Sequence, residues 1–89
     1  MNKTELRRAS IRLITQTVVI TLIDCKIDNW KQYKEAMSLE YTKRITNKRL
    51  YEILSVIRHA RDVLKKKGHA EKAEKINILS NHFEDTLIR

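Results

Sequence analysis

The chain has 89 residues, which suits one domain that buries roughly 60–65% of its unfolded surface. Nineteen basic residues outnumber 11 acidic ones, giving a formal net charge of +8, and hydrophobic residues reach 42%, which excludes a disordered tail. One Gly and no Pro exclude a sheet built on tight hairpins, whereas plentiful Lys, Glu, Arg, Leu and Ile favour helices. We therefore predict one all-α domain over residues 1–89, folded as a small antiparallel three- or four-helix bundle.

The first predicted helix begins near Thr4, which can cap it, and it has apolar stripes on two nearly opposite sides. One stripe recurs every seven residues and comprises Leu6, Leu13, Ile20 and Ile27, with Ala9 and Ile23 on the same face. The other comprises Ile11, Ile14, Val18, Leu22 and Cys25. A helix that is apolar on two sides must be covered on both. We expect the first stripe to face the bundle and the second to form a homodimer interface.

Residues 17–23 allow a second interpretation, because they are rich in β-branched side chains and could form a strand. Such a strand could pair only with its copy in a second subunit, and the sequence leaves helix and intersubunit strand open. The apolar run 13–23 is shorter than a membrane span, and no small residues precede a cleavage point. Cys25 has no partner cysteine, which fits a reducing compartment. We expect a cytoplasmic protein with no membrane association, in which Cys25 is a small buried hydrophobe.

A second, shorter helix follows Asp28 or Asn29, either of which can cap it. Its apolar residues lie on one face at helical spacing and predict core packing rather than a ligand site. These residues are Trp30, Tyr33, Met37 and Tyr41.

Two longer helices complete the predicted bundle. The third is capped by Thr46 or Asn47 and runs to Lys67, where Gly68 supplies a left-handed C-terminal cap. Its expected core face is Leu50, Ile53, Leu54, Ile57, Ala60 and Leu64. The fourth runs from about Ala70 to the end, with a core face of Ala73, Ile76, Leu79, Phe83 and Leu87.

Most of the excess positive charge falls on residues 41–67, which hold nine basic and two acidic residues. A basic helix surface with an exposed aromatic ring matches a phosphate backbone and an unstacked base. The predicted nucleic-acid-binding residues are Lys43, Arg44, Lys48, Arg49, Tyr51, Arg58, Arg61 and Lys65. The same charges also fit an ordinary solvated helix face. A helix-turn-helix over residues 32–52 is disfavoured, because the joint from Leu39 to Thr46 is long and lacks Gly.

No group of residues converges on a catalytic chemistry. His59, His69 and His82 match no zinc-binding spacing, and Gly68, the only glycine, excludes a glycine-rich phosphate loop. We predict a non-enzymatic protein without metal, cofactor or small-molecule substrate. The expected function is that of a nucleic-acid-binding accessory or regulatory protein. The alternative is a protein-interaction module, such as an inhibitor, chaperone or immunity-type bundle, that acts through an apolar helix face.

Overall fold

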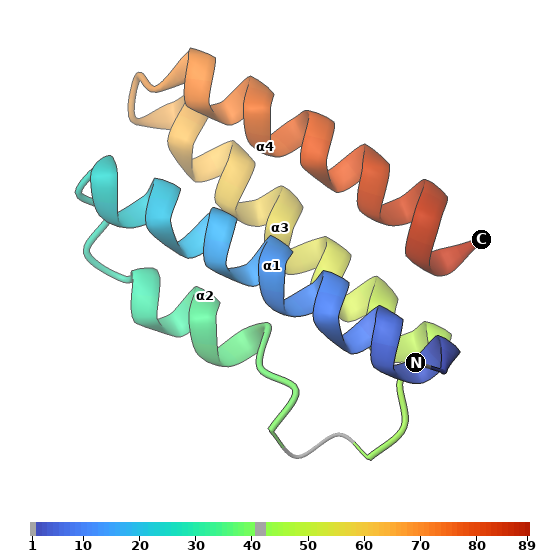
Figure 1. The fold of residues 1–89 in the computed structure, drawn as a ribbon. Coiled ribbons are helices and arrows are strands. Elements are labelled where there is room, and N and C mark those ends of the chain that lie inside the picture. The colour runs from blue at the N-terminus through green and yellow to red at the C-terminus, as the bar shows by residue number, and fades with distance from the viewer. Residues whose placement is uncertain (1, 41–42) are drawn as a thin grey trace.

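The computed structural model describes residues 2–40 and 43–89, and these residues form an antiparallel four-helix bundle (Figure 1). The helices are α1 (Lys3–Asp24), α2 (Trp30–Ala36), α3 (Asn47–Lys66) and α4 (Ala70–Phe83), and α4 continues as a short π-helix, η1 (Glu84–Ile88). In Figure 1, α1 and α3 begin at the same end of the bundle, and α2 and α4 run back towards that end. The predicted all-α bundle is confirmed. The described residues contain no strand, and residues 17–23 are helical, so the interpretation of this segment as an intersubunit strand is wrong.

The helix ends follow simple capping chemistry. The Asn2 side chain accepts a hydrogen bond from the Glu5 N–H at 2.9 Å, so Asn2 caps α1 in place of the predicted Thr4, which lies inside the helix. Thr46 caps α3 as predicted, accepting from the Arg49 N–H at 3.2 Å. Gly68 adopts φ +90°, a conformation that side chains disfavour, and turns the chain from α3 into α4. At the start of α2, Asn29 is the cap residue but makes no side-chain cap bond.

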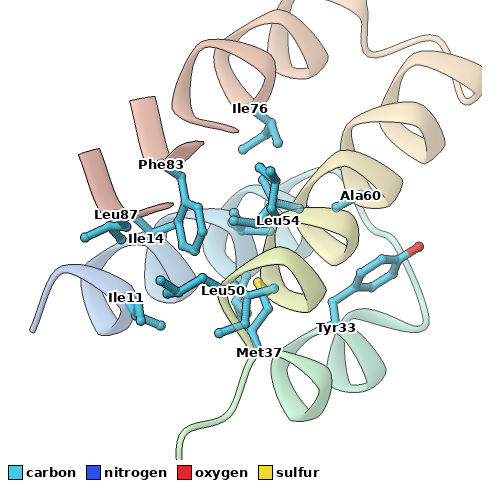
Figure 2. Packing of buried hydrophobic residues seen from close by; sticks show 14 of the residues in the cluster. Ile11, Ile14, Tyr33, Met37, Leu50, Leu54, Ala60, Ile76, Phe83 and Leu87 are labelled. Atoms are coloured by element: carbon cyan, nitrogen blue, oxygen red, sulfur yellow. The ribbon is translucent and has the colours of Figure 1, made fainter. Parts of the chain in front are cut away.

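The core lies between all four helices, and α3 contributes its whole predicted face (Figure 2). All six predicted α3 residues are buried, and Phe83 and Ile76 reach them from α4. Tyr33 on α2 and Met37 just after α2 complete the core on that side, and Trp30 is partly buried against it. Tyr41 lies outside the described residues. The predicted α4 positions are also buried, except that Leu79 is partly exposed.

The orientation of α1 is the reverse of the prediction. The face directed into the bundle comprises Ile11, Ile14, Val18, Val19 and Leu22. Ile11, Val18 and Leu22 are fully buried within one protomer, so the prediction that this stripe forms a dimer interface is wrong. Packing against three other helices requires a wide apolar face, and Val19 widens this stripe, whereas Gln16 interrupts the opposite one. Of the stripe predicted to face the core, only Ile27, beyond the end of α1, is buried.

Candidate interaction surfaces

Three of the eight predicted nucleic-acid-binding residues are engaged inside the protomer. The Arg49 guanidinium donates to the carbonyl oxygens of Ala36 and Ser38 at 2.8 and 2.7 Å, which ties the end of α2 to α3. Arg58 pairs with the Glu84 carboxylate at 3.3 Å in η1. A guanidinium held by acceptors in this way is a poor candidate for releasing its contacts to a phosphate.

Arg61 is the third of these residues. Its guanidinium donates to Asn77 Oδ1 at 2.7 Å and to Asp62 Oδ1 at 2.9 Å. The first of these bonds joins α3 to α4. The three arginines therefore point to three different elements and do not line one ligand surface.

The remaining cations of the predicted site divide between the two ends of α3. Lys43, Arg44 and Lys48 are exposed where α3 begins, and within the described residues they make no ion pair. Lys65 is exposed at the other end of the helix, about 26 Å away along the helix axis from Lys48. The structure therefore brings together Lys43, Arg44 and Lys48, which we call the basic end, and separates Lys65 from them.

Tyr51 stands one turn into α3 from the basic end. Its side chain is 54% exposed, and it borders a shallow hollow of about 370 Å³ that also includes Leu54, Ser55 and Arg58. An exposed tyrosine ring on a rigid helix presents a flat apolar face to solvent. Tyr51 and the basic end thus occupy the same half of α3.

A second surface lies on α1, on the stripe that was predicted to face the core. Leu6, Leu13 and Ile20 are 54%, 65% and 58% exposed, and Ile23 is also exposed. Figure 1 shows why: α1 lies over α3 between α2 and α4, and no helix of the described residues covers its outer side. The spacing could have revealed this surface, since positions 6, 9, 13, 16, 20 and 23 follow the alternating three-and-four pattern of a coiled-coil seam.

Tyr33, His59 and Cys25, whose side chains could take part in chemistry, instead make contacts within the fold. The Tyr33 hydroxyl and His59 Nδ1 form a hydrogen bond of 2.8 Å between α2 and α3, and their rings stack. Burial raises the pKa of Tyr33, and a side-chain hydrogen bond with Asn29 opposes that rise. Cys25 is partly buried against the core. No group of His, Cys, Asp and Glu within residues 2–40 and 43–89 could hold a metal ion.

The connection between α2 and α3 occupies residues 37–46, longer than the three- or four-residue turn of a helix-turn-helix. No helix in the described part of the chain is long and apolar enough to cross a membrane. No family model, curated protein or solved structure matches this chain.

Proposed function

We propose that this chain is a non-enzymatic nucleic-acid-binding accessory or regulatory protein that contacts the phosphate backbone with the basic end and Tyr51. The observation that supports the proposal best is the grouping of Lys43, Arg44 and Lys48, all exposed and without an ion pair among the described residues, in a chain of net charge +8. This site is smaller than the predicted surface over 43–67, because Arg49, Arg58 and Arg61 are already bonded to other elements.

The chemistry of the basic end suits a polyanion. Each cation that neutralises a phosphate releases condensed counterions, which makes binding favourable and sensitive to salt. The N-terminus of α3 adds its partial positive charge at the same place. The Tyr51 ring offers a stacking surface to an unpaired base, and stacking of this kind tolerates any base. We therefore expect binding with little sequence preference and a preference for single strands.

A matched pair of triple variants tests the proposal. Fluorescence anisotropy of labelled single-stranded and duplex oligonucleotides would be followed over a salt series, with Lys43→Gln, Arg44→Gln and Lys48→Gln combined. The slope of log affinity against log salt should become shallower by roughly 2–3, since each phosphate contact contributes about 0.7–0.9. The control combines Lys65→Gln, Lys66→Gln and Lys67→Gln, which removes the same charge from the other end of α3.

The control variant should keep most of the affinity and slope. Equal losses in the two triple variants would mean that binding follows total charge, and the proposed site would be wrong. Undetectable binding of the wild-type chain at low salt would contradict the proposed function itself.

A second candidate function, a protein-interaction module, is favoured by one observation: the uncovered apolar face of α1. Apolar side chains as large as Leu6, Leu13 and Ile20, aligned on one helix, are typical of a contact with another protein.

A further inference from the structure

The uncovered face of α1 has the positions of a coiled-coil seam. Six residues alternate at spacings of three and four, as the a and d positions of successive heptads do. These residues are Leu6, Ala9, Leu13, Gln16, Ile20 and Ile23, and we call them the seam. All six are exposed, and the seam is about 26 Å long. A helix of similar length could therefore cover it.

Covering the seam would leave few polar groups without partners. Residues 13–23 carry no charge, and Gln16 is the seam's one polar member. Thr17, beside the seam, donates its hydroxyl to the Leu13 carbonyl oxygen at 2.9 Å, and Thr21 donates to the Thr17 carbonyl oxygen at 2.8 Å. Hydroxyls bonded to their own helix need no partner from outside, so an apolar surface can pack here at little desolvation cost.

Charge along α1 selects both the occupant and its direction. Lys3 and Asp24 are exposed and occupy the same heptad position on one flank of the seam, three heptads apart. If a second α1 lies antiparallel on the first, each Lys3 meets the Asp24 of the second copy. The two helix dipoles then point in opposite directions, which is the favourable arrangement. A parallel pair would instead place the basic N-terminal parts of the two α1 helices side by side, together with the positive ends of both helix dipoles.

We propose that two copies of this chain associate through their seams, with the two α1 helices packed antiparallel. The two-fold axis passes between Leu13 and Gln16, so that Leu6 lies opposite Ile23 of the second copy and Ala9 lies opposite its Ile20. Each copy then presents the same patch to the other, as a two-fold symmetric contact requires. A contact of one helix pair is small for a stable dimer, so the dimer should dissociate on dilution.

Sedimentation analysis over a concentration series to about 1 mM tests the seam. The wild-type chain should change from monomer to dimer, and Leu13→Glu should weaken dimerisation by at least about a hundredfold, because it buries unpaired charge. Its circular dichroism should be unchanged, since Leu13 is 65% exposed in the protomer. The matched control is Ile78→Glu, which changes an equally exposed apolar residue on α4, outside the seam, and should leave the dimer intact.

A charge exchange tests the direction. Lys3→Glu and Asp24→Lys should each weaken the dimer by roughly threefold to tenfold, and the double variant should restore it. Both single changes favour α1 itself, since they place an acid at its start and a base at its end, so loss of the dimer cannot come from loss of the helix.

A double variant as weak as the single ones would overturn the antiparallel arrangement. A wild-type chain that stays monomeric throughout, or binds anionic phospholipid vesicles through Leu13 instead, would overturn self-association. None of these outcomes depends on nucleic-acid binding, which uses the other surface.

Discussion

At the scale of single residues, the arginines of α3 that contact another element each meet an acceptor on that element. Arg49 holds carbonyl oxygens at the end of α2, and Arg61 holds the Asn77 side chain of α4. Bonds from a charged donor are stronger than neutral ones and fix geometry as well as distance. These side chains explain how a small, highly charged chain aligns its helices, and they reduce the charge that is available to a ligand.

Thr15 on α1 shows the opposite situation. Its hydroxyl oxygen is buried and has no hydrogen-bond partner among the described residues. An unpaired buried hydroxyl costs about 1–3 kcal/mol. Thr15→Val keeps the shape and removes that cost, so we predict a free energy of unfolding that is about 1 kcal/mol higher, raising Tm by about 4–8 °C.

Thermal denaturation followed by circular dichroism would measure this gain. Thr21→Val is the matched control, since that hydroxyl donates to the Thr17 carbonyl oxygen and its removal should bring no gain. Equal stabilisation by the two changes would show that the unpaired hydroxyl of Thr15 is not the cause.

At the scale of elements, the helices with a single apolar face could be predicted closely, and α1 could not. The buried face of α3 from Leu50 to Leu64 agrees in full with the prediction, and the two ends of this helix follow from Thr46 and Gly68. A helix with one apolar stripe and a strong signal at each end has only one way to pack. In α1 the periodicity indicates two apolar stripes but does not show which of them faces the core. The choice depends on how many helices pack against α1, which no local pattern contains.

The candidate site was only partly predictable for a related reason. The exposure of Lys48 and Tyr51 follows from their positions on the outer side of α3, so the helical pattern can find them, and Lys43 lies in the polar connection that precedes that helix. The acceptors of Arg58 and Arg61 lie far along the chain, on Glu84 and Asn77, and only the folded arrangement brings them near.

The reversed orientation of α1 predicts different outcomes for two substitutions on one helix. Val18 is fully buried within its own bundle, so Val18→Lys places an unpaired charge in the core and should unfold the protomer. A loss of about 3–5 kcal/mol is a large part of a small domain's stability. Loss of the helical signal in circular dichroism, beside a folded Leu13→Glu, is the expected result. A folded, monomeric Val18→Lys would instead place that stripe at a subunit interface.

At the scale of the whole molecule, the two proposed surfaces are compatible. The basic end lies where α3 begins, at the end of the bundle where α1 also begins (Figure 1). In an antiparallel dimer the two basic ends would therefore lie at opposite ends of the α1 pair. Two separated, identical sites on one particle would favour long nucleic acids over short ones through simultaneous contact.

In the proposed dimer, α1 buries the face of Val18 in its own protomer and offers the face of Leu13 to a second copy. Hydroxyl-radical footprinting of the wild-type chain at low and high micromolar concentration tests both parts together. Leu13 and Ile20 should be oxidised in the dilute protein and protected in the concentrated one, whereas Ile78 should react in both and Val18 in neither. Oxidation of Leu13 that does not change with concentration, or a reactive Val18, would contradict this arrangement of α1.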